Sequence, residues 1–142
     1  MKSDKDKGSV PVLEDIKPNT RMILAGFWIA QFLLWTFGDM VGLLQDLNDP
    51  ISNELLAFVA APLALTQAGM IILSLSGPVK LARWSNLVVL PVFILFNIGY
   101  LSEGKYGWQF LLGAGYILVN ILIMIYAWKW PRIEMKSKGE VA

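Results

Sequence analysis

Four long apolar segments constrain this chain more than any other feature of its sequence. They cover about residues 22–44, 55–76, 84–101 and 108–130, and each contains about 18 to 23 residues. A helix rises about 1.5 Å per residue, so about 20 residues cross the roughly 30 Å of hydrocarbon in a bilayer. The segments show no two-residue alternation, which excludes a β-barrel. The sequence therefore predicts an all-α integral membrane protein, a four-helix transmembrane bundle.

The composition agrees with the bilayer as the main solvent of this chain. Of the 142 residues, 56% are hydrophobic and only 16% are charged. This balance is too apolar for an ordinary soluble domain. The predicted organisation is a flexible polar N-terminal tail over residues 1–20, one transmembrane domain over residues 21–131, and a flexible C-terminal tail over residues 132–142.

The distribution of Lys and Arg predicts an orientation in the membrane. Only Lys105 lies in the loops after the first and third segments, whereas the other eleven basic residues flank the opposite ends of the segments. By the positive-inside tendency, both termini and the loop after the second segment are expected to face the cytoplasm. The eleven residues are Lys2, Lys5, Lys7, Lys17, Arg21, Lys80, Arg83, Lys129, Arg132, Lys136 and Lys138.

Two residue types are absent, and their absence limits the chemistry of the chain. There is no Cys and no His, which removes disulfides, thiol nucleophiles, imidazole bases and the usual side-chain ligands of haem, zinc and copper. The net charge of +1 gives no reason to expect a nucleic-acid partner. The sequence makes an enzyme the less favoured reading, and it identifies no cofactor and no metal site.

Local signals predict where the helices begin, bend and meet the membrane surface. Asp49 is the expected N-cap of the second segment, with Pro50 in its first turn. Pro62 and Pro91 are expected to kink the second and third segments. Tyr100 is expected to lie in the aromatic belt at the membrane interface.

A few polar residues within the apolar segments are the candidate site residues. In the first segment, Asp39 shares one helical stripe with Gln31, Trp35, Gly38 and Gly42, a stripe expected to face the bundle. The two glycines are predicted to be packing residues that allow close helix contact, with an alanine-rich band of the second segment as their partner. The other candidates for binding a ligand or a proton are Gln67, Asn97, Asn120 and Tyr116.

The buried amides have a structural interpretation and a functional one. Amide side chains often form hydrogen bonds between membrane helices, at about 0.6 kcal/mol on average, and this is the favoured reading for Gln31, Gln67, Asn97 and Asn120. Asp39 is different, because a carboxylate near the bilayer centre costs about 2.5 to 3.5 kcal/mol even on the lenient insertion scale. Apart from Lys129, next to the end of the fourth segment, no Lys or Arg lies inside the segments. Asn97, the Trp35 Nε1 and Tyr100 are the expected hydrogen-bond partners of Asp39.

Short motifs in the four segments resemble a known group of membrane proteins. They are Asp39 with Gly42-Leu43, Thr66-Gln67, Leu81-Ala82-Arg83-Trp84-Ser85-Asn86 and Tyr126-Ala127-Trp128-Lys129-Trp130. With these motifs, residues 21–130 resemble small bacterial four-helix membrane proteins of unknown function, distantly similar to the DoxX-like group. The resemblance implies a bacterial cytoplasmic membrane and a link, as a membrane partner, to quinone-dependent redox systems. Arg83 is expected to meet anionic headgroups.

Three functions stay open from the sequence. The favoured one is a non-enzymatic membrane protein that holds a small apolar or amphipathic ligand, or a partner subunit, in the bundle against Asp39 and the amides. The second is a small proton-coupled transporter or exporter, acting as a homodimer with Asp39 as the proton site. The third is an accessory membrane subunit of a quinone-linked redox system. The partners expected are the lipid bilayer and a small hydrophobic ligand or quinone.

Overall fold

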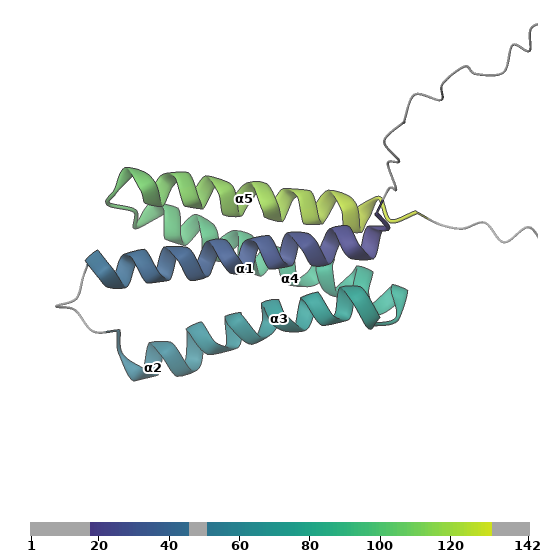
Figure 1. Cartoon of the computed structure of the whole chain (residues 1–142), viewed down its shortest axis with the longest axis horizontal. Coiled ribbons are helices and arrows are strands. Elements are labelled where there is room, and N and C mark those ends of the chain that lie inside the picture. The colour runs from purple at the N-terminus through teal and green to yellow at the C-terminus, as the bar shows by residue number, and fades with distance from the viewer. Residues whose placement is uncertain (1–17, 46–50, 132–142) are drawn as a thin grey trace, which may run out of the picture.

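The computed structural model describes residues 18–45 and 51–131, and within those ranges its regular structure is all helical, with short connections between the helices (Figure 1). The predicted tails, over 1–20 and 132–142, lie almost wholly outside the described residues, as does the predicted cap Asp49. In chain order the elements are α1 (Thr20–Gln45), α2 (Asn53–Leu55), η1 (Leu56–Ala60), α3 (Ala61–Ser76), α4 (Val79–Ser102) and α5 (Gly107–Trp128).

The four predicted membrane-spanning helices are confirmed in these ranges. Thr20–Leu44, Asn53–Ser76, Val79–Ser102 and Gly107–Trp128 are each long and apolar enough to cross a membrane. The second of these combines α2, η1 and α3. The chain therefore has the all-α architecture of a multi-pass membrane protein.

The helix ends follow from short polar signals beside each apolar run. Asn19 Oδ1 accepts a hydrogen bond from Met22 N (3.0 Å) at the start of α1. Ser52 caps α2, because its Oγ accepts from Leu55 N (3.2 Å), so the described start of the second spanning helix uses Ser52. Asp49 was expected in this role from the Asp-Pro pair alone.

The third spanning helix is longer than the sequence predicted. α4 begins at Val79, directly after Gly77 and Pro78, whereas the apolar pattern predicted a start at 84. The first turn was not predicted as part of the helix, because its charged residues Lys80 and Arg83 place it outside the apolar segment. A helix can begin outside the hydrocarbon region, since its backbone bonds are all internal.

The two prolines inside the spanning segments have different surroundings. A π-helical turn, η1, ends two residues before Pro62, and Thr66 Oγ1 donates to the Pro62 carbonyl (2.8 Å). π turns alter the direction of the side chains that follow them, and they often lie at functional sites. Pro91 lies inside α4, which continues as one helix on both sides.

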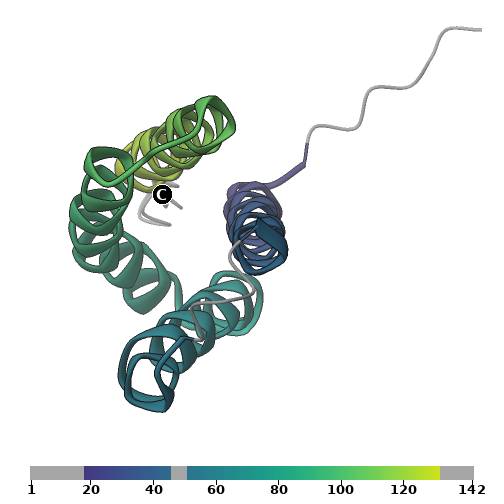
Figure 2. The same ribbon diagram turned by 90° about the vertical axis from the view of Figure 1, so that its left-hand side faces the viewer.

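The helices form a ring in the order α1, α3, α4, α5, with α5 returning to α1 (Figure 2). The terminal end of the bundle is where α1 begins and α5 ends; the distal end is where α1 ends and α5 begins. Towards the distal end, η1 and α2 lead away from α1, as Figures 1 and 2 show. The helices are therefore joined more closely at the terminal end.

The hydrophobic core lies towards the terminal end of the bundle. Its central pair is Trp28 and Phe93, whose rings meet edge to face with centroids 5.3 Å apart. Beside them, Trp28 Nε1 donates to Asn86 Oδ1 (2.7 Å). Asn86 Nδ2 in turn donates to the Ala82 carbonyl (2.7 Å) and to Ser74 Oγ (3.4 Å), so this buried amide has partners on both of its polar atoms.

Two arginines hold helix ends together at the terminal end. Arg21 Nη1 donates to the carbonyls at the end of α3, most closely to that of Gly77 (2.7 Å). Arg83 donates from Nε to the Ala127 carbonyl (3.2 Å) and from Nη2 to that of Trp128 (3.3 Å). Arg83 was expected to meet lipid headgroups, but in this fold it satisfies the free carbonyls at the end of α5.

Candidate ligand-binding pocket

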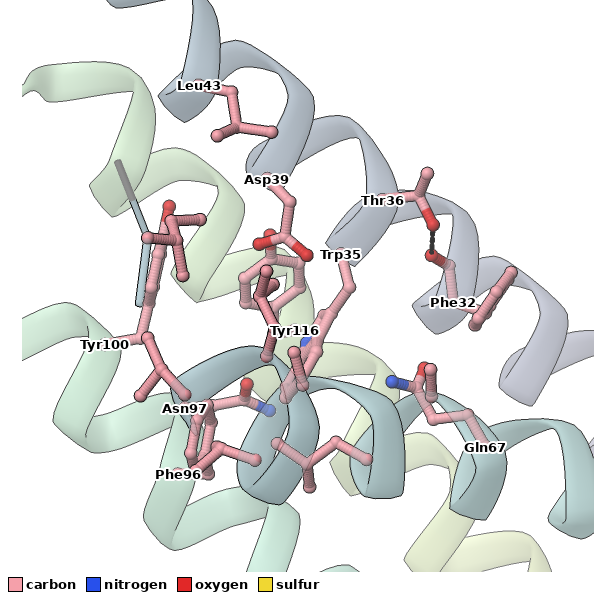
Figure 3. A pocket seen from close by; sticks show the side chains of 17 residues that line it. Phe32, Trp35, Thr36, Asp39, Leu43, Gln67, Phe96, Asn97, Tyr100 and Tyr116 are labelled. Carbon is pink, nitrogen blue, oxygen red and sulfur yellow. Dashed lines mark hydrogen bonds between the residues drawn. The ribbon is translucent and has the colours of Figure 1, made fainter. Parts of the chain in front are cut away.

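A cavity of about 360 Å³ lies in the distal half of the bundle, between α1, η1, α3 and α4, with Tyr116 contributed by α5 (Figure 3). Residues of α2 and η1, the segment that diverges from α1 in Figure 1, contribute to its lining. Its volume falls near the lower end of the range of about 300–1,000 Å³ found for small-molecule sites.

One wall of the pocket is apolar and comes mainly from the second spanning helix. Leu55, Leu56 and Val59 face the cavity from α2 and η1, and Leu63 and Ala64 face it from α3. The π turn of η1 falls among these residues, so it sets which side chains of this helix reach the cavity.

A second wall is built from aromatic rings of three helices. Trp35 of α1 packs against Phe96 of α4 and Tyr116 of α5, with ring centroids 5.4 Å and 6.0 Å away. Tyr100 of α4 packs against Tyr116 at 5.5 Å. These four residues, the aromatic wall, all line the cavity. Their rings hold one another in tilted arrangements that are favourable for aromatic pairs.

Asp39 points from α1 into this space, on the same side as Tyr100, Tyr116 and Asn97 (Figure 3). The cavity is open enough that the side chain remains exposed. The hydrogen bonds expected from Asn97, the Trp35 Nε1 and Tyr100 are not formed. Among the described residues, no hydrogen bond or ion pair involves the Asp39 carboxylate. It is thus placed at the cavity and free to pair with a bound molecule.

Several other polar groups lining the pocket also lack partners within the described chain, whereas Thr36 and Tyr116 donate to backbone carbonyls of α1. Both amide atoms of Asn97, the Oε1 of Gln67 and the Nε1 of Trp35 are buried without a hydrogen bond. Asn97 is 0% exposed and Gln67 is 1% exposed. The expected interhelical hydrogen bonds of these amides are therefore not made. Each unpaired buried group costs about 1–3 kcal/mol, so the arrangement is costly for stability alone.

Gln31 and Asn120 lie outside the pocket. Both are fully buried, and none of their amide atoms has a hydrogen-bond partner among the described residues. Gln31 is one turn beyond Trp35 towards the terminal end of α1, and Asn120 is one turn beyond Tyr116 on α5. The structure thus divides the candidate site residues: Asp39, Trp35, Gln67, Asn97 and Tyr116 line the cavity, and Gln31 and Asn120 do not.

The two glycines of α1 have different roles. A Cβ on Gly38 would come within 2.6 Å of Tyr116 Oη, so this glycine makes room for Tyr116 to reach α1 and donate to the Leu34 carbonyl (3.2 Å). A Cβ on Gly42 would meet nothing within 4 Å. Gly38 therefore packs against α5 and not against the predicted alanine band, and no close neighbour of Gly42 is found among the described residues.

Sequence reasoning missed the roles of Phe96 and Asn86 of α4, and it expected Tyr100 both at the membrane interface and as a hydrogen-bond partner of Asp39. Phe96 and Tyr100 line the cavity, and Asn86 makes the hydrogen bonds of the core. Tyr100 was assigned to the membrane interface because it is aromatic and near a segment end. The repeating stripe of Ala82, Asn86, Leu90, Phe93 and Asn97, which is buried throughout, was the available signal.

The lining of the pocket suits an organic ligand better than a metal ion. Among residues 18–45 and 51–131, no group of three or more acidic side chains gathers to hold a metal. Comparison of the chain with known protein families, curated proteins and solved structures finds no match. The geometry of the pocket therefore carries the functional argument alone.

Proposed function

We propose that this protein is a membrane-embedded binding protein that holds one small amphipathic molecule in the distal pocket. The supporting observation is the set of buried, unpaired polar atoms of Trp35, Gln67 and Asn97 around an otherwise apolar cavity. Ligand sites are mostly apolar, with a few polar groups that fix orientation, and this cavity has that composition.

Gln31 and Asn120 are unpaired in the packed interior, whereas the unpaired groups of the pocket border space that a bound molecule can fill. Unpaired buried polar groups cost about 1–3 kcal/mol each, and the total stability of a domain is only about 5–15 kcal/mol. A bound molecule with hydrogen-bonding groups would pair with these atoms and offset that cost. Apolar side chains of similar size would fill the same positions at less cost if packing were their only role.

The proposal also includes a location. The protein is placed in the cytoplasmic membrane of a bacterium, with both termini in the cytoplasm. The distribution of Lys and Arg supports this orientation, which turns the distal end and its pocket to the outer side of the membrane.

Filling the pocket tests the proposal. In Ala64→Phe, a ring would project from α3 into the cavity, whereas Ala61 is exposed on the same helix and does not line it. Protein purified in an uncharged detergent is extracted with organic solvent, and the released lipids and quinones are quantified by mass spectrometry. We expect the wild type and Ala61→Phe to carry a compound in near-equal molar amount and Ala64→Phe to lose it.

Equal recovery from all three proteins would reject the pocket as the binding site.

Asp39→Asn and Asp39→Ala, measured in the same way and by thermal melting, show whether the carboxylate takes part in binding. If both variants keep the full amount of ligand and lose no stability, Asp39 has neither a binding nor a structural role. A quinone among the released compounds would favour the redox-subunit alternative.

A second candidate function, a small proton-coupled exporter acting as a dimer, is favoured by one observation. Asp39 lies in a cavity at one end of the bundle, while the other end is closed by the core around Trp28 and Phe93. Transporters hold a substrate site open to one side at a time. Flux driven by a proton gradient in proteoliposomes, and abolished in Asp39→Asn, would select this function over static binding.

A further inference from the structure

The charges of the described residues are separated between the two ends of the bundle. At the distal end lie Asp39, Glu54 and Glu103, with Lys105 as the basic residue, which gives a net charge of −2. At the terminal end lie four basic residues and no described acid: Arg21, Lys80, Arg83 and Lys129. The electrostatic potential around the pocket therefore attracts cations and repels anions.

Within the lining of the pocket, Asp39 is the acidic residue, and no basic residue accompanies it. None of the residues that line the cavity is basic, and no described Lys or Arg forms an ion pair with Asp39. The low dielectric of the surrounding apolar side chains strengthens attraction to any cation that enters. An anionic ligand would meet both this carboxylate and the surrounding negative potential.

The aromatic wall defines what kind of cation fits. Trp35, Phe96, Tyr100 and Tyr116 lie together beside Asp39, and the faces of such rings attract weakly hydrated organic cations. The opposite wall is aliphatic, with Leu55, Val59 and Leu63. A hydrated inorganic ion would gain little there, because it needs several oxygen ligands in place of its water.

We propose that the ligand of this pocket is an organic monocation with an apolar body, its charge paired with Asp39 and its body held between the aromatic wall and the aliphatic side chains of η1 and α3. This inference rests on the proposed binding function and specifies its ligand class. The amides of Asn97 and Gln67 orient polar substituents of the same molecule.

Two probes of matched shape and opposite charge test the charge selectivity. Tetraphenylphosphonium and tetraphenylborate are titrated into the purified full chain in an uncharged maltoside detergent, by calorimetry, with protein-free micelles as the blank. We expect saturable binding of one phosphonium per chain and no saturable binding of the borate. Asp39→Asn is expected to lower the phosphonium affinity by roughly 30-fold or more, and Asp39→Glu to keep most of it.

Glu103→Gln is the matched control, because it removes one negative charge at the same end without touching the pocket. It should change phosphonium affinity by about threefold or less, as expected of a screened surface charge. An equal loss in Glu103→Gln and Asp39→Asn would overturn the proposal, since a diffuse surface potential would then explain the selectivity. Equal binding of the two probes would overturn it as well.

The outcomes also separate this inference from the proposed function. If phosphonium fails to bind but Ala64→Phe still loses a neutral compound that the wild type carries, the pocket binds a ligand and the cationic class is wrong. If phosphonium binds and Ala64→Phe abolishes its binding while Ala61→Phe does not, both proposals are supported. Unchanged melting temperatures of the Asp39 variants confirm that a lost affinity does not come from misfolding.

Discussion

Asn86 and Asn97 lie on the same face of α4, and both are completely buried. At the terminal end, Asn86 accepts from Trp28 and donates to Ala82 and Ser74. At the distal end, Asn97 borders the cavity, and neither of its amide atoms has a hydrogen-bond partner among the described residues. Asn86 thus stabilises the fold at the terminal end, whereas the unpaired amide of Asn97 lowers the stability of the fold at the distal end.

The difference follows from how closely the helices approach one another. At the terminal end, a two-residue connection joins α3 to α4, and Arg21 and Arg83 bind the carbonyls of neighbouring helix ends. Side chains there are close enough to reach across the bundle. At the distal end, the divergence of η1 separates the helices. Polar side chains there face a cavity and do not reach one another.

The largest expected effect is at the terminal end. Trp28→Ala removes a fully buried ring from the core and the donor that pairs with Asn86, so it should lower the free energy of unfolding by about 3–5 kcal/mol. The measurement is a denaturation titration in mixed micelles. The control is Phe37→Ala on the exposed face of α1, which should lose much less. Equal losses would mean that the terminal end is not the stable core of the bundle.

Replacing each of the two asparagines by Leu should affect the free energy of unfolding differently. Asn86→Leu leaves the Trp28 Nε1 buried and unpaired, and should cost about 1–3 kcal/mol. Asn97→Leu removes two unpaired polar atoms, and should leave the free energy of unfolding unchanged or raise it by about 1 kcal/mol. The same titration measures both. If Asn97→Leu destabilises as strongly as Asn86→Leu, Asn97 is interhelical glue, and the contrast between the ends is lost.

The smallest effect is expected at the glycines of α1. Gly38→Ala would push a methyl group against Tyr116 and should cost about 1 kcal/mol, with a lower melting temperature. Gly42→Ala meets nothing within 4 Å and should stabilise the helix by up to about 1 kcal/mol. Thermal melting in detergent measures both variants. A loss of stability in Gly42→Ala would show that this glycine does pack closely, against a surface outside the described chain.

Much of the fold follows from the sequence because lipid allows few alternatives. Backbone groups in a membrane must be paired within their own segment, so each long apolar run becomes a helix. The α1 stripe of Gln31, Trp35 and Asp39 was predictable from helical spacing. The start of α4 was not, because its first turn carries Lys80 and Arg83 and resembles a loop in a hydropathy pattern.

The candidate site was less predictable, because spacing along a helix does not say how far away the next helix lies. Gln31 and Asn97 have the same apolar surroundings in the sequence, but only Asn97 borders the cavity. Tyr100 resembles a membrane-interface anchor in the sequence, but it belongs to the aromatic wall. Gly38 and Gly42 have the same spacing as a packing motif, yet only Gly38 lies against another helix.

The sequence by itself determined that the chain forms four membrane-length helices, and which face of α1 carries the polar residues. Both depend on local physics, namely the transfer of apolar side chains into lipid and the period of the helix. The tertiary structure decided that Asp39 meets a cavity and that Asn86 pairs while Asn97 does not. Those outcomes depend on the distances between helices. The divergence at η1 sets these distances, and the sequence of a single helix does not determine them.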